Sequence, residues 1–337
     1  MELTKNFFYQ YIFFIFLLFA LGILRERIST ILKLYDVPNS KRKIHKVPIS
    51  LINGFIILIT LNLYFIFDIL FFKEFNLKFD IIMIILVNFF YLLGYYDDIK
   101  DLSPKTKSFL IFGTLLITIP FDQNLILNSL IFKELIDKTI YLNQSSIFIT
   151  IFFIYIFYNF MNFIDGLNGV AISVSIFFII ILALERGQFF KLEILMLSCL
   201  LYCLILNLAN KSFLGNSGIS ALSIFISILY IRDYNLYKNL LCDEIFLIFF
   251  IPGLDMTRLV FSRILSGKSI SDADKNHLHH YLTNFFNKKY VFIIYIAISI
   301  IPYIIFILIS KIFISIIISL VFYIILILFL KRTSKEL

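Results

Sequence analysis

The chain has 337 residues and a formal net charge of +8; hydrophobic residues make up 61% of it and charged residues 15%. Soluble domains are about half apolar and a quarter charged, so this composition and a mean hydropathy of +0.95 exclude a soluble globular protein. Three cysteines in or beside apolar runs give neither a disulfide framework nor a metal-binding spacing. The composition indicates a multi-pass membrane protein.

Apolar runs of about 17–25 residues can each cross a bilayer. Taken in chain order, eleven such runs predict spans near residues 6–24, 49–71, 79–96, 108–121, 146–164, 170–184, 192–209, 219–231, 241–254, 290–310 and 312–330. The segment 122–145 has room for a re-entrant piece. The first run lacks a cleavage site and is expected to be a retained anchor. We therefore expect an all-α polytopic membrane protein with about 10–11 transmembrane helices in a single domain.

Lysine and arginine divide unevenly between the two sides of this predicted bundle. One set of loops and the C-terminal tail hold 20 of the 30, and the positive-inside rule makes that side cytoplasmic. The N-terminus is then outside and the C-terminus inside. The same face carries all four histidines, His45, His277, His279 and His280. We expect an active site on this face, since a transporter would place ionisable residues near mid-span, where Asp68 is the one candidate.

The first two polar segments of the cytoplasmic face are a basic stretch and a segment that begins with an acidic cluster. Residues 36–46 are basic and include His45 and Lys46; positive-inside anchoring explains the lysines and arginines but not the histidine or the Asp-Val-Pro start. Residues 97–107 contain Asp97, Asp98, Asp101 and Lys107. Carboxylates at a span end cost several kcal/mol unless they stay hydrated, bind a cation or do chemistry. The alternative for this acidic cluster is helix capping and solvation.

The third segment combines amides, a carboxylate and glycines. Asn159 and Asn162 share a helix face at the end of a span, with Asp165 one turn further. Gly166 and the glycine at 169 let backbone N–H groups approach a ligand. Oxygen ligands stacked in this way suit a hard cation such as Mg²⁺, whereas hydrogen bonds between helices are the alternative role for the asparagines.

The fourth and fifth segments add a glycine-rich loop and a histidine group. Residues 213–218 read Phe-Leu-Gly-Asn-Ser-Gly, a pattern that half the time is only a turn. Residues 255–280 contain Arg263 and end in His277-x-His279-His280. Such a group suits either a transition metal or a phosphorylated ligand held by histidines and basic residues.

The five segments, in this order and on one face, resemble the polyprenyl-phosphate N-acetylhexosamine-1-phosphate transferases, nearer the O-antigen and exopolysaccharide initiators than the peptidoglycan enzyme. The resemblance rests on Asp97-Asp98-x-x-Asp101-Leu-Ser-Pro, Asn159-x-x-Asn162-x-x-Asp165-Gly and His277-x-His279-His280. It covers residues 36–282; residues 283–337 form terminal helices and a short basic tail. It implies a phosphotransferase of the inner membrane that takes a UDP-sugar and undecaprenyl phosphate, binds the lipid bilayer and no nucleic acid, and leaves a homodimer open.

The resemblance also implies roles for individual residues. The catalytic residues would be Asp97, Asp98, Asp165 and the three histidines of the fifth segment. Asp97 would act as a base or as the residue that positions the lipid phosphate. Asn162 and Asn216 would bind Mg²⁺, which Mn²⁺ could replace. The substrates would be bound by His45, Lys46, Lys107, Gly166, Asn168, Phe213 and Arg263.

Three positions depart from the family pattern. Asn216 and Asn168 stand where relatives usually have Asp, and Asn53-Gly54 replaces a Gly-Gly pair. The loss of two carboxylates keeps open a second hypothesis, a catalytically weak or silent membrane subunit that binds polyprenyl phosphate or UDP-sugar. A transporter is the third hypothesis, and the sequence shows neither the mid-span ionisable pairs nor the internal repeats that it requires.

Overall fold

The computed structural model describes residues 2–36, 47–185, 190–269 and 276–333. The α-helices are α1 Glu2–Ile23, α2 Arg25–Leu32, α3 Ile52–Phe67, α4 Leu77–Lys100, α5 Pro104–Thr118, α6 Ser146–Ile164, α7 Val170–Leu184, α8 Phe190–Leu208, α9 Gly215–Tyr237, α10 Cys242–Ile248, α11 Phe250–Leu265, α12 Leu278–Leu282, α13 Val291–Ile309 and α14 Ile312–Thr333. A π-helical turn, Asp68–Phe72, extends α3. Short 3₁₀ turns cover Ile119–Phe121, Gln123–Leu125 and Asn143–Ser145.

Within the described ranges, seven of these helices are long and apolar enough to cross a membrane. The number rises to nine if each of two bent pairs is one span: α1–α2, bent by 67°, and α10–α11, bent by 71°. The two short runs of the sequence form α5 and α7, of 15 residues each. The all-α polytopic fold is therefore confirmed, and the total of 10–11 spans stays a prediction.

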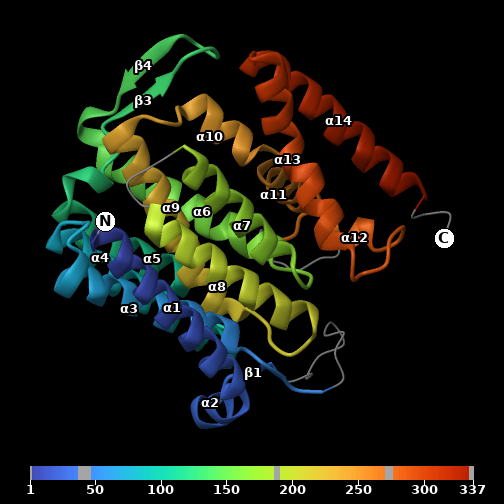
Figure 1. Ribbon diagram of the computed structural model, residues 1–337. Coiled ribbons are helices and arrows are strands. Elements are labelled where there is room, and N and C mark those ends of the chain that lie inside the picture. Colours follow the sequence, from blue (N-terminus) through green and yellow to red (C-terminus); the bar gives the residue numbers. More distant parts are fainter. Residues whose placement is uncertain (1, 37–46, 186–189, 270–275, 334–337) are drawn as a thin grey trace.

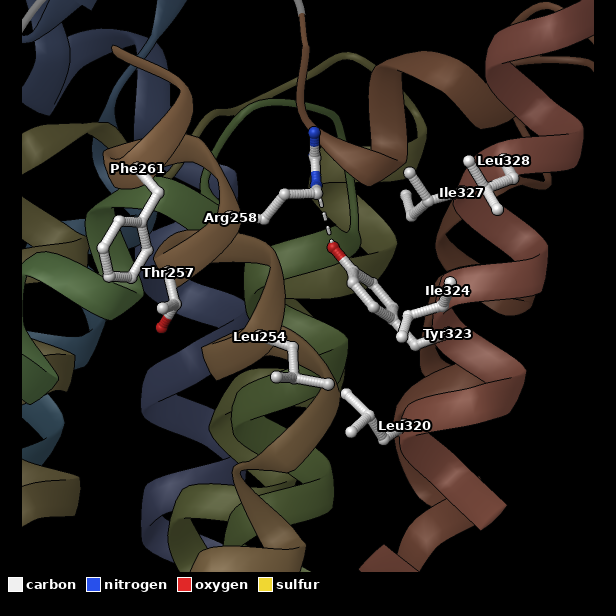
Figure 2. Close-up of a pocket in the computed structure, with 9 residues that line it drawn as sticks. All are labelled: Leu254, Thr257, Arg258, Phe261, Leu320, Tyr323, Ile324, Ile327 and Leu328. Carbon is white, nitrogen blue, oxygen red and sulfur yellow. Dashed lines mark hydrogen bonds between the residues drawn. The ribbon is translucent and has the colours of Figure 1, made fainter. Parts of the chain in front are cut away.

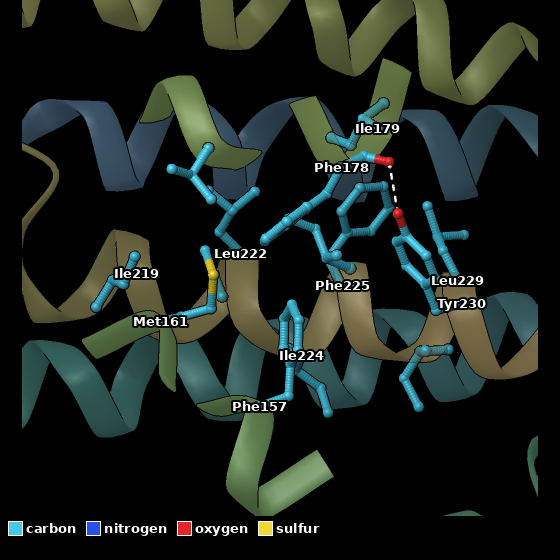
Figure 3. Packing of buried hydrophobic residues seen from close by; sticks show 14 of the residues in the cluster. Phe157, Met161, Phe178, Ile179, Ile219, Leu222, Ile224, Phe225, Leu229 and Tyr230 are labelled. Carbon is cyan, nitrogen blue, oxygen red and sulfur yellow. Dashed lines mark hydrogen bonds between the residues drawn. The ribbon is translucent and has the colours of Figure 1, made fainter. Parts of the chain in front are cut away.

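Helix α9 lies at the centre of the bundle and packs against α3, α4, α6 and α7 (Figure 1). Phe157 and Met161 of α6 and Phe178 of α7 meet its buried side, and the Tyr230 hydroxyl of α9 donates to the Phe178 carbonyl at 2.9 Å (Figure 3). Almost every residue between positions 217 and 234 of α9 is buried. Lipid therefore has little access to α9, and the other spans surround it.

Glycines allow α3 and α4 to approach the first turn of α9 closely. A Cβ added to Gly54 would lie 2.7 Å from the Gly218 nitrogen, and one added to Gly94 would lie 2.1 Å from the Asn216 carbonyl oxygen. Both distances are far below van der Waals contact, so a larger residue at either position would push the helices apart. Small residues serve this purpose at membrane-helix contacts generally. Gly54, of the departing Asn53-Gly54 pair, thus has a packing role.

The expectation of a re-entrant piece in residues 122–145 is wrong. This stretch forms 3₁₀ turns and an antiparallel hairpin of β3 Ser129–Phe132 and β4 Lys138–Tyr141. Asp243 fixes the hairpin turn, because its Oδ2 atom accepts hydrogen bonds from the Lys133 and Glu134 nitrogens at 2.6 and 3.0 Å. The hairpin lies at the opposite end of the bundle from α2, α12 and the small pair β1 Tyr35–Asp36 and β2 Ile49–Ser50 (Figure 1).

The predicted span 241–254 is also incomplete. The helix breaks at Phe249, and α11 then continues to Leu265. Residues 255–265, expected in a loop, are helical because buried Asp255 and Arg263 find partners on other elements. The described parts of the third, fourth and fifth polar segments lie partly on the helices α6, α9, α11 and α12.

Asp68, the mid-span candidate for a transport pathway, has a structural role. Its two carboxylate oxygens accept hydrogen bonds from the Glu74 and Phe75 nitrogens, at 3.0 and 2.9 Å, and so close the turn before α4. Arg232 of α9 is likewise occupied, since its guanidinium donates to Asp122 at 2.8 Å. These buried charged groups hold turns and helices together near the hairpin end of the bundle.

Candidate active site

Asp97 holds the turn that joins α4 to α5. One of its carboxylate oxygens accepts a hydrogen bond from the Leu102 nitrogen at 2.9 Å, and the other forms an ion pair with Lys107. The turn itself follows from the sequence: Asp101 adopts a left-handed conformation (φ 47°), and Ser103 caps α5 by accepting from the Thr106 nitrogen at 3.2 Å. Both Asp97 oxygens are therefore engaged, and the carboxylate is balanced by a neighbouring cation.

Asp98 connects the acidic cluster to the fourth segment. Its Oδ1 atom accepts a hydrogen bond from the Asn216 nitrogen at 2.9 Å, and its Oδ2 atom accepts one from the Ser217 nitrogen at 3.0 Å. These N–H groups belong to the first turn of α9, where the helix has no internal partner for them and favours an anion. Gly215, with φ 70°, leads into this turn, and a Cβ there would lie 3.0 Å from Asp98 Oδ2.

The third segment ends α6 beside this carboxylate. The side-chain nitrogens of Asn159 and Asn162 donate to the carbonyls of Tyr155 and Tyr158 on their own helix, at 2.8 and 2.9 Å. The carbonyl oxygen of each amide is left as the atom that can accept a donor or bind a cation. Asp165 follows immediately as the C-terminal cap of α6. The amide nitrogens of both Asn side chains are thus bonded within α6. Cation binding and hydrogen bonding between helices both stay predictions for the amide oxygens.

Asp165 is accessible to solvent but surrounded by protein atoms. Desolvation, and to a lesser extent the charge of Asp98, raises the pKa of Asp165 to about 7. Asp98 and Asp165 are therefore close enough to sense each other's charge, although they come from different helices. Two carboxylates in one pocket repel each other unless a proton or a cation intervenes.

The histidine segment closes against the end of α6. His279 is 1% exposed, and a Cβ added to Gly166 would lie 2.1 Å from its Nε2 atom. The His277 ring lies 5.6 Å from the Phe163 ring, centroid to centroid, and the Arg263 guanidinium lies over the same ring at 4.9 Å. Residues 163–166 therefore contact both the histidines and Arg263, which brings the third and fifth segments together.

Burial determines the protonation state of His279. Desolvation, followed by the nearby His280 and His277, lowers the pKa of His279 well below its usual value, so the ring is neutral at physiological pH. In the part of the chain that the structure describes, neither of its ring nitrogens has a hydrogen-bond partner. A neutral imidazole carries one donor and one acceptor, and both remain for a ligand.

Other predicted residues lie at the edge of this site. Asn168 donates to Asn210 Oδ1 at 2.7 Å and to the Asn207 carbonyl at 3.3 Å, which ties it to the end of α8. The Phe213 nitrogen donates to the Ser50 carbonyl at 2.8 Å, next to β2. His45 and Lys46 lie outside the described residues. The binding roles of all four remain predictions.

The donor set fits a hard divalent cation by its chemistry. Asp98, Asp165 and the amide oxygens of Asn162 and Asn216 are the oxygen ligands that Mg²⁺ prefers. Within the described ranges no three His, Cys, Asp or Glu side chains gather in a metal-binding cluster.

Gly94 was not among the predicted site residues, and Gly215 and Ser217 were predicted only as members of the segment 213–218. All three act through backbone geometry: the glycines permit close approach, and Ser217 donates its N–H to Asp98. The signal for two of them was present in the glycine-punctuated residues 213–218, where a helix starts directly after a turn.

Two comparisons show which known proteins this chain is similar to. Residues 80–233 match the model of glycosyl transferase family 4. A curated relative from Bacillus subtilis (strain 168), described as "Probable undecaprenyl-phosphate N-acetylglucosaminyl 1-phosphate transferase", is 30% identical over 202 residues, which are 57% of this chain and 55% of the relative. The chain therefore matches about half the length of that relative. The family match includes the Asp98, Asp165 and Asn216 segments and ends before the histidines.

Proposed function

We propose that this multi-pass membrane protein, whose residues 80–233 match the model of glycosyl transferase family 4, belongs to that family and transfers a sugar-1-phosphate from a UDP-sugar to undecaprenyl phosphate. The sugar is an N-acetylated hexosamine or deoxyhexosamine, and the product starts a cell-envelope polysaccharide. The observation that carries the proposal is the junction of Asp98 with the first turn of α9, beside Asp165. It joins three of the five polar segments into one carboxylate-rich site.

In the proposed reaction, an oxygen of the lipid phosphate attacks the β-phosphorus of the UDP-sugar. The bond between this phosphorus and the oxygen bridging to the α-phosphate breaks, and UMP leaves with that oxygen. Transfers of this kind need positioning and charge neutralisation more than covalent chemistry. Bound Mg²⁺ or Mn²⁺, held by Asn162 and Asn216 with Asp165 beside them, would supply positive charge against the diphosphate.

The contacts of Asp97 favour a positioning role over a role as base. Both carboxylate oxygens of Asp97 are already engaged, one by the Lys107 ammonium and the other by the Leu102 nitrogen. The pair nevertheless places a lysine beside the acidic cluster, where it can bind the lipid phosphate once the phosphate competes with Asp97. Asp98 fixes the junction of α4 with the first turn of α9, and Asp97 would hold the cation that receives the acceptor substrate.

The fifth segment supplies the donors for the other phosphates. Neutral His279 offers one N–H from a desolvated position, and Arg263 is held near His277 through Phe163. Hydrogen bonds to a phosphoryl group are strongest where water is excluded. Gly166 and His279 are packed together, which supports a diphosphate position near the end of α6.

A radiolabel transfer assay tests the proposal. Purified protein is incubated with undecaprenyl phosphate, Mg²⁺ and a panel of UDP-N-acetyl sugars labelled in the sugar, and the label in the lipid fraction is measured together with UMP. We expect transfer from at least one donor and loss of transfer in Asp98→Asn. Retained binding of UDP-sugar without any transfer would favour the silent-subunit hypothesis, which Asn216 and Asn168 in place of Asp support.

A further inference from the structure

A group of buried polar side chains joins α11 to α14. It is separate from the carboxylates Asp97, Asp98 and Asp165 of the candidate site. Tyr323 of α14 reaches across to Arg258 of α11 at the edge of an apolar groove of about 310 Å³ (Figure 2). The Arg258 Nε atom donates to the Tyr323 hydroxyl at 3.0 Å, and this hydroxyl donates to Asp255 Oδ1 at 2.8 Å. Arg258 also donates to Asp255 Oδ1 at 2.6 Å. Asp255, Arg258 and Tyr323 therefore form a closed triangle, called the α11–α14 clamp below.

The clamp also binds the backbone on both sides of His277. Arg258 donates to the carbonyl oxygen of Asn276 at 2.5 Å, and Asp255 Oδ2 accepts from the Leu278 nitrogen at 3.0 Å. The residues immediately before and after His277 are thus fixed to α11. Leu278 is fully buried, and Asp255 and Tyr323 are each 4% exposed, so water competes little with the bonds of Asp255 to the Leu278 nitrogen and the Tyr323 hydroxyl.

We propose that the α11–α14 clamp positions the histidine segment, with Asp255, Arg258 and Tyr323 acting as positioning residues for His277 and His279. The inference rests on the proposed function for its effect on catalysis, but the position of the histidines is a structural property that is measured separately. Through Tyr323, α14 then helps to position the site, although no residue of α14 belongs to the polar segments.

Charge and geometry explain why these three residue types are needed. Asp255 carries a buried carboxylate that accepts from Arg258, Tyr323 and the Leu278 nitrogen. Arg258 uses separate nitrogens for Tyr323 and for the pair of Asp255 and Asn276; a lysine has one nitrogen and cannot span all of these positions. The Tyr323 hydroxyl serves as donor and acceptor at once, so its removal weakens both charged partners.

The test uses full-length protein in detergent with the variant Tyr323→Phe and the matched control Tyr303→Phe, whose hydroxyl contacts Glu185 instead. Histidine modification by diethyl pyrocarbonate is followed by mass spectrometry. Neutral His279 is a good nucleophile that burial protects, and loosening of the segment exposes it. We expect His279 in Tyr323→Phe to react about threefold faster or more, and in Tyr303→Phe to react as in the wild type.

Kinetics give the second measurement. Per unit of folded protein, Tyr323→Phe should lower kcat/KM for the UDP-sugar about tenfold, the scale of a small misplacement of binding groups. In a background that carries both His277→Ala and His279→Ala the same change should cost less than about twofold, because a positioning residue has no further effect once its targets are removed. If Tyr323 had a structural role alone, Tyr323→Phe would reduce the amount of folded protein. Its kcat/KM per unit of folded protein, relative to the parent protein, would then stay near one in both backgrounds. Arg258→Lys is the second variant and carries the same expectations if Tyr323→Phe folds poorly.

The outcomes separate the two proposals. Unchanged His279 reactivity in both variants would overturn the clamp, whatever the transfer assay shows. Faster reaction of His279 in a protein that transfers no sugar would retain the clamp and reject the proposed function. Faster reaction of His279 together with a full, additive loss of kcat/KM in the background that lacks both histidines would overturn the link between the clamp and catalysis through His277 and His279.

Discussion

Asp98→Asn keeps the size of the side chain but replaces one carboxylate oxygen with an amide NH₂ group. In the structure both oxygens accept N–H groups from the first turn of α9, at 2.9 and 3.0 Å. One of these donors would face another donor in the variant. Losing a hydrogen bond to a charged group costs about 1.5–3 kcal/mol, and losing an anion at a helix N-terminus about 0.3–1 kcal/mol. The junction of α4 and α9 should therefore lose about 2–4 kcal/mol.

Thermal unfolding with a thiol-reactive fluorescent dye measures this loss, because Cys199 and Cys203 are buried and free and react only when the bundle opens. At on the order of 2 °C per kcal/mol for a chain of this size, we expect a fall in Tm of about 4–8 °C. Transfer should fall at least about a hundredfold, as when a positioned charge is removed from a site.

The exposed residue Asp101 gives a matched control. It caps α4 with φ 47°, a conformation that Asn adopts more easily than other residues, so Asp101→Asn should leave Tm and transfer within error of the wild type. If Asp98→Asn unfolds and transfers as the wild type does, the α4–α9 junction is neither a stabilising contact nor part of the reaction, and the site proposed above is wrong.

Three further predictions test the pocket and its orientation. Because the pKa of Asp165 is raised to about 7, the folded protein keeps the carboxyl proton between about pH 4 and 7, where the unfolded chain releases it. The free energy of unfolding should therefore fall with rising pH across that window, and transfer should rise with a midpoint near pH 7. Asp165→Asn should remove the pH dependence of both. Asn216→Asp adds a charge to the oxygen ligands, so the Mg²⁺ concentration for half-maximal transfer should drop; an unchanged dependence would place residue 216 away from the metal. Cysteines introduced at Lys105 and Asn276 should react with a membrane-impermeant reagent only from the cytoplasm, and one at Asn76 only from outside; labelling of Lys105 and Asn276 from opposite sides would split the site.

The sequence predicted the helices well because a bilayer requires apolar runs of a fixed length. It failed where that rule does not apply. Residues 255–265 read as a loop because charged side chains interrupt the apolar pattern, yet Asp255 and Arg258 are satisfied by each other and by Tyr323. The hairpin β3–β4 was missed because it is short and lies outside the predicted spans.

The candidate site divides in the same way. Which segments carry chemistry could be predicted, since Asp, Asn and His stand out among apolar residues. How they pair could not: Asp98 bonds to backbone N–H groups more than 110 residues away in the chain, an arrangement that depends on how α4 packs against α9. The different roles proposed for Asp97 and Asp98 could not be predicted either, because they depend on the turn that brings Lys107 next to Asp97.

The buried position of α9 has a consequence for how the protein is made. Among the seven unbroken candidate spans of the described chain, α9 is the least apolar, and it carries buried Arg232, Asp233 and several serines. Such a segment enters lipid poorly by itself. Its neighbours α3, α4, α6 and α7 all precede it in the chain, so they are synthesised first and can receive α9 as it leaves the ribosome. Shortened chains that lack α3 or α4 should therefore leave α9 outside the bilayer, even though its own sequence is intact.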